Sequence, residues 1–247
     1  MYLLILIFAI VAGVGLVLAR RAAAEKRLTR DLGTELGPLA DRLELEVLVL
    51  EQDQRHATID QLLAGSRLHR PAASGETRFD RVIQGRLDGY PVTLFDLRDG
   101  KTGANLFTVL VLHSPGTALP RFQLEAKGIG SGLPPKVESL QPLEPEDSVL
   151  FNESFALEVR DEDRERLETL LRGPAMEYFE ARLEARLVVE SLGDRFLTYE
   201  VNRVLSAAQS ETLLRRSTEL ADALTGRVRP PPPRPEPQSS TGPTAGG

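Results

Sequence analysis

The sequence predicts an α+β fold, with an antiparallel sheet of about six to eight strands and helices on one face, preceded by one transmembrane helix. Three observations lead to this prediction. The Asp88-Gly89 pair separates two apolar runs, and its residues suit the positive φ angles of a type I′ hairpin turn. Several further short apolar runs end at turn residues, as strands do. Residues 2–19 carry no charge, as a membrane-spanning helix requires.

A second sheet architecture fits the same order of elements. A strand-rich middle followed by a long final helix is also compatible with a pleckstrin-homology-like barrel, by analogy of fold alone. In either architecture the first hairpin is expected to pair Val82, Ile83 and Leu87 with Val92, Leu94 and Phe95.

The composition is that of a globular protein with one domain. The 247-residue chain is 41% apolar and 27% charged, which is ordinary for a folded protein. Its net charge is −6 and acids alternate with bases along the chain, so no basic patch for nucleic acid is expected. The absence of cysteine excludes disulfides, thiolate metal sites and cysteine nucleophiles.

Residues 1–21 form a predicted transmembrane anchor. The uncharged stretch at residues 2–19 would span about 27 Å as a helix, close to the roughly 30 Å of a bilayer core. This predicts contact with the lipid bilayer through residues 2–19. The alternatives are a buried core helix and a cleaved signal peptide, the second because Ala22 and Ala24 form a small-residue pair of the cleavage type. Such a peptide, however, carries its basic residues before the apolar run.

Basic residues flank the anchor on one side only. None precedes the span, and five follow it: Arg20, Arg21, Lys26, Arg27 and Arg30. Because cytoplasmic flanks carry the excess of lysine and arginine, the N-terminus is expected outside and the remaining chain in the cytoplasm. The sequence thus predicts a single-pass protein of the cell (inner) membrane. Its strong preference for arginine over lysine suggests a GC-rich bacterial genome.

The rest of the chain divides into three segments. Residues 22–42 form a predicted juxtamembrane helix, because leucines recur there every three or four positions. Residues 43–226 form the predicted cytoplasmic α+β domain. Residues 227–247 form a predicted disordered Pro-rich tail, because they lack apolar core residues after Val228.

Within the domain, strand and helix patterns alternate with turn signals. The predicted strands cover residues 43–50, the hairpin at 79–97, then 106–112, 122–126, 155–159, and a second hairpin at 186–190 and 195–201. The predicted helices cover residues 58–64, 161–172, 174–183 and 203–224, with Gly173 and Gly226 as stop signals. Residues 128–147, rich in proline and glycine, are expected to form an irregular excursion.

Phosphate-binding and nucleophile motifs are incomplete. Residues 100–102 read as the end of a phosphate-binding loop, but Phe95 occupies the place of its first glycine and a strand follows. Residues 128–132 alternate glycine with other residues, but prolines rather than a helix come next. Ser131 lies between glycines without the spacing of a nucleophile elbow.

Acid-base and metal-binding patterns are equally weak. His56, His69 and His113 have neither the i, i+4 spacing nor the neighbouring acid of a zinc motif. Asp96 and Asp99 could serve as a carboxylate pair, but with 36 acids in the chain such pairs arise by chance. The sequence therefore predicts no catalytic residue, no cofactor-binding residue and no metal ligand.

Three segments, residues 85–96, 118–128 and 151–179, carry longer motifs. They read G-x-x-x-G-x-x-V-x-x-F-D, L-P-x-F, and F-N-x-x-F-x-V-x-x-x-D followed by a leucine pair and a proline. The residues concerned are Gly85, Gly89, Val92, Phe95, Asp96, Leu119, Pro120, Phe122, Phe151, Asn152, Phe155, Val159, Asp163, Leu170, Leu171 and Pro174. In these residues the chain resembles a family of uncharacterised bacterial single-span membrane proteins. It departs from the family in having Arg172 and Gly173 where that pattern has one residue.

The resemblance covers roughly residues 43–224 and implies an architecture rather than an activity, because its motifs are structural. We predict a membrane-tethered, non-enzymatic binding or scaffold module with a protein partner. The alternative is an enzyme whose site is assembled from scattered acidic and arginine residues. A concave pocket with converging polar groups of shifted pKa would favour the enzyme, and a flat surface would favour the module.

Overall fold

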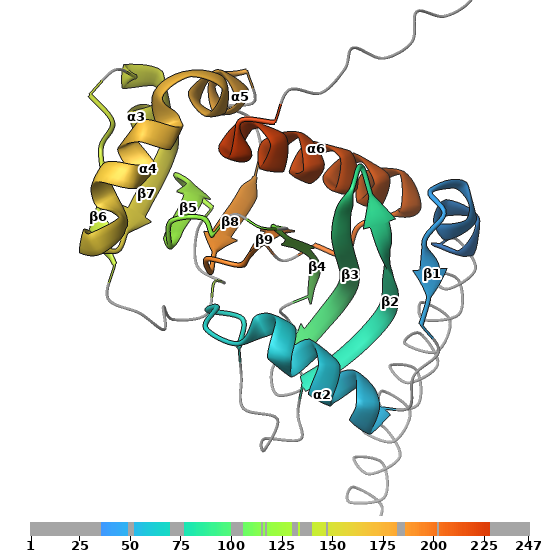
Figure 1. Ribbon diagram of the computed structural model, residues 1–247. Helices are drawn as coiled ribbons and strands as arrows, with labels where there is room; N and C mark the ends of the chain where they lie inside the picture. The colour runs from blue at the N-terminus through green and yellow to red at the C-terminus, as the bar shows by residue number, and fades with distance from the viewer. Residues whose placement is uncertain are drawn as a thin grey trace, which may run out of the picture.

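The computed structural model describes residues 36–48, 52–69, 77–99, 106–114, 116, 118–129, 133, 140–146, 148–181, 186–201 and 203–227 (Figure 1). The predicted anchor at residues 1–21 lies outside these residues, as do residues 22–35 of the predicted juxtamembrane helix and 228–247 of the predicted tail. Among the residues that are described, no helix has the length and apolar character needed to cross a bilayer.

The described strands form one nine-stranded antiparallel sheet in the order β1-β2-β3-β4-β9-β8-β5-β7-β6. They are β1 (Glu46–Val47), β2 (Thr77–Leu87), β3 (Tyr90–Asp99), β4 (Leu106–His113), β5 (Phe122–Ala126), β6 (Gln141–Pro142), β7 (Phe155–Val159), β8 (Leu187–Ser191) and β9 (Arg195–Glu200). The predicted α+β class is confirmed. The sheet exceeds six to eight strands because the short strands β1 and β6 pair at its two ends.

The barrel alternative is wrong. Among the described strands, β1 pairs with β2 at one end of the sheet and β6 pairs with β7 at the other, so the sheet is open. Each end strand contains only two paired residues. Short end strands limit the edge available for pairing with another chain.

Helices cover both faces of the sheet. They are α2 (Gln52–Leu63), α3 (Val149–Ser154), α4 (Arg164–Leu170), α5 (Met176–Glu180) and α6 (Ala207–Thr225), with short turns η2 (Asp161–Asp163) and η3 (Leu171–Ala175). One apolar cluster joins the sheet to α3, α4, α5 and α6, and a second joins it to α2. The prediction that helices lie on one face is therefore wrong.

Strand β4 shows why both faces need cover. Leu110 and Leu112 belong to the cluster with α6, whereas Val109 and Val111 belong to the cluster with α2. All four side chains are fully buried. Because alternate residues of a strand point to opposite faces, a continuous apolar run requires a packed layer on each side.

Two hairpin turns are present as predicted. Asp88 has a φ of 52° and Gly89 a φ of 87°, the positive values that a type I′ turn requires. Strands β8 and β9 pair across residues 192–194, where Gly193 has a φ of 98°. Both turns are encoded locally, by residues that tolerate a positive φ.

The register of the first hairpin agrees only in part with the expected pairs. Ile83 lies opposite Leu94, as expected, but Val92 lies opposite Gly85. The register shifts at a bulge between Asp80 and Ile83. A bulge adds an unpaired residue to one strand, and this change was not predicted.

Helix α6 lies at the predicted position, with capped ends. Ser206 and Gln209 form a capping box at its N-terminus, so the helix begins after residue 206 rather than at residue 203. Gly226 ends it in the left-handed conformation with a φ of 67°. The predicted stop signal is therefore confirmed.

Residues 36–42 are helical and pack on the sheet. Leu36 and Leu39 are buried in the same cluster as α6. Leu45 lies so close to β2 that a Cβ atom on Gly85 would stand 2.7 Å from its Cδ2 atom. The described end of the predicted juxtamembrane helix thus packs with the sheet and α6.

The other predictions match to different degrees. Strands at residues 122–126 and 155–159 are present with the expected bounds. The strand predicted over residues 43–50 is limited, where it is described, to Glu46–Val47. Helix α2 is longer than the predicted residues 58–64.

Candidate functional site

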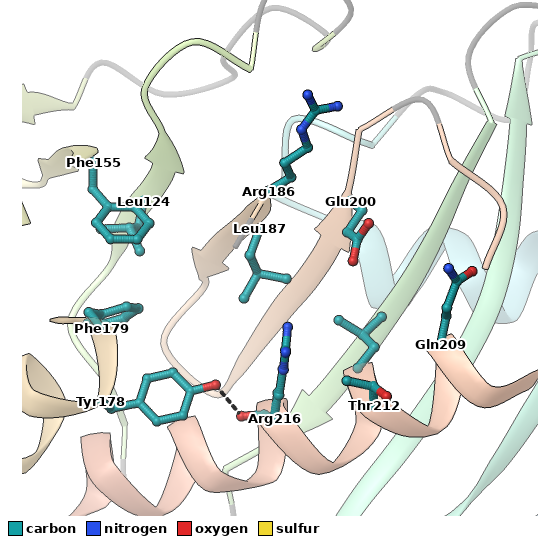
Figure 2. A pocket seen from close by; sticks show the side chains of 11 residues that line it. Leu124, Phe155, Tyr178, Phe179, Arg186, Leu187, Glu200, Gln209, Thr212 and Arg216 are labelled. Atoms are coloured by element: carbon teal, nitrogen blue, oxygen red, sulfur yellow. Dashed lines mark hydrogen bonds between the residues drawn. The ribbon is translucent and has the colours of Figure 1, made fainter. Parts of the chain in front are cut away.

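A pocket lies between helices α5 and α6 and strands β5, β7, β8 and β9 (Figure 2). Its volume is about 170 Å³. The floor is apolar and is built by side chains from five elements, β5, β7, α5, β8 and α6. The floor residues are Leu124, Phe155, Phe179, Leu187 and Leu213.

A cluster of phenylalanines fixes one side of this floor. The ring centroids of Phe151 and Phe155 lie 5.3 Å apart, and that of Phe179 lies 5.7 Å and 5.9 Å from them. All three rings are buried. Because close-packed aromatic side chains have little freedom to move, this part of the pocket is preformed.

The rim of the pocket is polar, and several of its groups are already engaged. The rim residues are Tyr178, Arg186, Glu200, Gln209, Thr212 and Arg216. The Tyr178 hydroxyl donates a hydrogen bond of 2.8 Å to the carbonyl oxygen of Arg216, drawn as a dashed line in Figure 2. The Thr212 hydroxyl donates to the carbonyl oxygen of Ala208 at 3.0 Å, and Glu200 accepts from Arg203 at 3.0 Å.

The two rim arginines are free to meet a ligand. Arg186 immediately precedes β8 and Arg216 lies on α6. In Figure 2 the Arg216 side chain extends toward the apolar floor, whereas the Arg186 side chain extends away from Arg216. Both residues are exposed. Neither guanidinium forms a hydrogen bond or ion pair with another residue in the described part of the chain. Open arginine donors therefore stand at the rim of an apolar floor.

The lining is poorly suited to acid-base chemistry. Among the described residues that line the pocket, the only carboxylate is Glu200, and there is no histidine, serine or lysine. General acid-base catalysis needs a proton donor and acceptor positioned on the reacting group. Since Glu200 is held by Arg203, the arrangement fits binding better than bond making.

A separate buried network lies on the face covered by α2. Glu190 accepts hydrogen bonds from the Tyr199 hydroxyl and from the backbone N–H of Arg67, the second at 2.9 Å. The Arg67 guanidinium donates to Glu125 at 2.9 Å. None of these four residues lines the pocket. The network ties the turn after α2 to strands β5, β8 and β9.

Burial controls protonation in this network. It raises the pKa of the Glu190 carboxyl above its usual value, although the hydrogen bonds from Tyr199 and Arg67 oppose the rise. Burial also raises the pKa of the Tyr199 hydroxyl well above its usual value, and the charge of Glu190 adds to this rise. A shifted pKa points to catalysis when the group reaches a cleft. Glu190 does not line the pocket. The two features expected of an enzyme site, a carboxyl group with a shifted pKa and a concave pocket, therefore occur in different places.

The carboxylates Asp96 and Asp99 do not form a catalytic pair in the described structure. Asp96 is buried and accepts hydrogen bonds from Arg81 Nε and Nη2, and from the Thr108 hydroxyl at 2.7 Å. Arg81 has a φ of 50° at the β2 bulge and also donates to the carbonyl oxygen of Leu205 at 3.1 Å. Asp96 therefore anchors the segment that leads into α6. The side chain of Asp99 lies outside the described residues.

The histidines do not come together as a metal site. His69 Nε2 lies 3.1 Å from Asp60 Oδ1. His113 ends β4, where burial and then the charge of Arg195 lower its pKa. The side chain of His56 lies outside the described residues. Within the described ranges no group of three or more histidine, cysteine or acidic side chains could hold a metal ion.

Sequence analysis did not identify the pocket. Residues 100–102, which gave the weak phosphate-loop signal, lie outside the described residues, as does half of the excursion at 128–147, including residues 130–132. Among the described lining residues, Phe155 alone belongs to a sequence motif, the F-N-x-x-F segment, and that motif was interpreted as structural. The adjacent aromatic residues Tyr178 and Phe179 were the available signal, because aromatics make up only 5% of the chain.

Comparisons with known proteins give one match of fold. No protein-family model matches the sequence, and no curated protein matches it. A solved structure, the crystal structure of the mycobacterial trehalose monomycolate transport factor A, TtfA, aligns with a TM-score of 0.53 and 17% identity. The alignment covers 83% of this chain and 99% of that chain. At this identity the likeness shows a shared fold alone.

Proposed function

We propose that this protein is a membrane-tethered, non-enzymatic binding module that serves as an accessory in a transport process. Residues 1–21 hold it at the inner membrane with residues 43–226 in the cytoplasm. The uncharged stretch at residues 2–19 and the basic residues after it support this placement. The resemblance of residues 43–224 to bacterial single-span membrane proteins supports it as well.

The observation that carries the proposal is the pocket. Its floor is apolar, and the described residues of its rim include arginines but no pair of groups placed for acid-base catalysis. The titratable group with the strongest reason to be catalytic, Glu190, is buried elsewhere. This separation speaks against an enzyme assembled from scattered acids and arginines, because a catalytic group must touch its substrate.

We base the proposed role in transport on the structural comparison with TtfA. TtfA is named as a trehalose monomycolate transport factor, and its fold is shared by this chain. A non-enzymatic accessory needs a binding surface and a fixed location in the cell. Here the surface is the pocket and the location is the inner membrane. We expect a protein partner; nucleic acid is not expected, because acids and bases alternate along the chain.

Location is tested with the full chain and a chain lacking residues 1–21. The full chain should sediment with membranes, and the shortened chain should remain soluble. External protease added to intact spheroplasts should leave the full chain uncut. Cleavage of the domain under these conditions, or a mature N-terminus beginning near residue 22, would overturn the cytoplasmic placement.

The transport role is tested by deleting the gene and comparing the lipids of inner and outer cell-envelope fractions. An accessory of transport changes the distribution of a lipid between fractions while its total amount stays constant. An enzyme changes the total amounts of a substrate and a product. The wild-type chain should restore the distribution, and the chain lacking residues 1–21 should not. A change in totals alone would favour the enzyme.

A further inference from the structure

We propose that the pocket binds a single alkyl chain that carries an anionic headgroup. The chain enters the apolar floor, and the headgroup meets Arg216 at the rim. This inference rests on the proposed function, because it names the ligand class of the same pocket. It commits to an oxyanion on an alkyl chain, whether the oxyanion is a carboxylate or a phosphate.

The volume and the apolar lining of the pocket suit one short segment of an alkyl chain. An engineered apolar cavity of about 150 Å³ holds one benzene molecule. The present pocket, at about 170 Å³, therefore has room for about six carbon atoms. Phe155, Phe179 and Leu213 offer such a ligand only apolar surface. Two parallel chains would not fit, so the ligand has a single chain or inserts one chain end.

The charges at the rim select the headgroup. Arg216 places a positive charge beside the floor and Arg186 adds a second at the rim, while Glu200, the one carboxylate among the described lining residues, accepts a hydrogen bond from Arg203. Neither rim guanidinium is engaged by another described residue. A planar guanidinium matches the oxygens of a carboxylate or phosphate with two parallel hydrogen bonds. The rim is therefore complementary to an oxyanion above a buried chain.

The backbone of Arg216 is held from the pocket side. The Tyr178 hydroxyl donates to the backbone carbonyl of Arg216 at 2.8 Å, which joins α5 to α6 across the pocket. In Figure 2 the Arg216 side chain extends from α6 toward Leu187. A headgroup near this side chain would keep its alkyl chain within reach of the floor.

The test uses full-length protein in phosphatidylcholine nanodiscs, with protein-free nanodiscs as the blank. Isothermal titration calorimetry measures butanoate, hexanoate, octanoate and decanoate, each below its micelle concentration. Octyl phosphate and octyl glucoside are the anionic and neutral probes of the same chain length. Comparing octanoate with octyl phosphate distinguishes the two anionic headgroups.

Chain length and headgroup should affect binding separately. Affinity should rise about fourfold for each methylene added up to hexanoate. This factor corresponds to a transfer free energy of ~0.8 kcal/mol per buried methylene. It should then level off, because later methylenes stay outside the pocket. Octanoate or octyl phosphate should bind at least about fivefold more tightly than octyl glucoside, as expected for charge-assisted hydrogen bonds.

Three variants locate the binding site. Arg216→Gln should weaken binding of the anionic probes about tenfold and leave octyl glucoside unchanged. Arg215→Gln is the matched control, because Arg215 is adjacent on α6, pairs with Glu211 and does not line the pocket. Thr212→Trp places a bulky side chain at the exposed mouth and should abolish binding of every probe. Unchanged thermal unfolding of each variant confirms that the fold is retained.

Two results would overturn the inference. Equal affinity for octanoate, octyl phosphate and octyl glucoside, together with no effect of Arg216→Gln, would contradict recognition of an anionic headgroup. Absence of binding by all probes, or binding that survives Thr212→Trp, would remove the pocket as the site. Neither result depends on the lipid distribution in the deletion strain, so this inference can fail while the proposed function stands.

Discussion

Two regions of this protein hold charged side chains in opposite ways. In the interior, Asp96 with Arg81 and Glu190 with Tyr199 are buried and meet several hydrogen-bond partners. At the pocket rim, the guanidinium groups of Arg186 and Arg216 are exposed and form no hydrogen bond or ion pair with another described residue. The interior groups are thus committed to the fold, while the rim groups keep their hydrogen-bonding capacity for a ligand.

This difference separates stability from binding. A buried charge that loses its partner keeps its desolvation cost, so the fold becomes much less stable. An exposed charge that is removed costs the fold little, because water solvated it already. The comparison therefore predicts that interior substitutions change unfolding and that rim substitutions change ligand affinity.

The largest effect is expected at Asp96. Asp96→Ala leaves the Arg81 side chain, which is 3% exposed, without its carboxylate. We expect a loss of about 3–5 kcal/mol in the free energy of unfolding, measured by urea denaturation. Glu162→Gln is the control, since its ion pair with Arg160 is exposed and should contribute little. A similarly small change in the free energy of unfolding for both variants would contradict the proposed difference between interior and exposed charges.

An intermediate effect is expected at Arg195, whose side chain is 14% exposed. Its guanidinium donates to the carbonyl oxygens of Gln61, Leu62 and Ala64 and so holds the C-terminus of α2. Arg195→Ala should lower the free energy of unfolding by about 1.5–3 kcal/mol. Amide hydrogen exchange should accelerate in α2 more than in α6. Uniform acceleration across both helices would contradict this local role.

A smaller, pH-dependent effect is expected at Glu190. Burial raises its folded pKa above the usual value near 4.5, so the folded chain retains this proton at pH values where the unfolded chain releases it. The stability that the protonated carboxyl contributes is complete below the unfolded pKa. It is lost as the pH rises through the folded pKa.

Glu190→Gln isolates this contribution, because glutamine does not ionise. At acid pH the variant should be less stable than the wild type by about 1 kcal/mol, for one poorly replaced hydrogen bond. This deficit should shrink as the pH rises. Urea denaturation at a series of pH values measures it, with Glu125 and Arg67 as the neighbouring charged groups that also act on Glu190. A constant deficit at all pH values would contradict the raised pKa.

Turns and caps could be predicted from the sequence because their causes are local. The Asp88-Gly89 turn and the Gly226 stop each depend on one or two residues that accept a positive φ. Strand β4 was also predicted, since its apolar run is continuous. What that run could not reveal is which helices cover its two faces, so the position of α2 on the second face was not predicted.

The candidate site could not be predicted, because it depends on contacts between distant segments. Leu124 and Arg216 line the same pocket only after β5 and α6 come together. Asp96 could not be distinguished in the sequence among 36 acids. Its partner Arg81 contacts it from the β2 bulge. Neither a bulge nor a shared pocket leaves a regular spacing in the sequence.

The smallest effect is expected at the pocket rim, where it tests the comparison most directly. Tyr178→Phe removes the hydrogen bond to the backbone of Arg216 and should lower the free energy of unfolding by about 1 kcal/mol or less. Arg216→Gln should change it by less than about 0.5 kcal/mol, because the side chain is exposed. Chemical denaturation of both variants gives these values. If Arg216→Gln proved as destabilising as Asp96→Ala, the rim arginine would be a structural group like those of the interior, and its availability to a ligand would be lost.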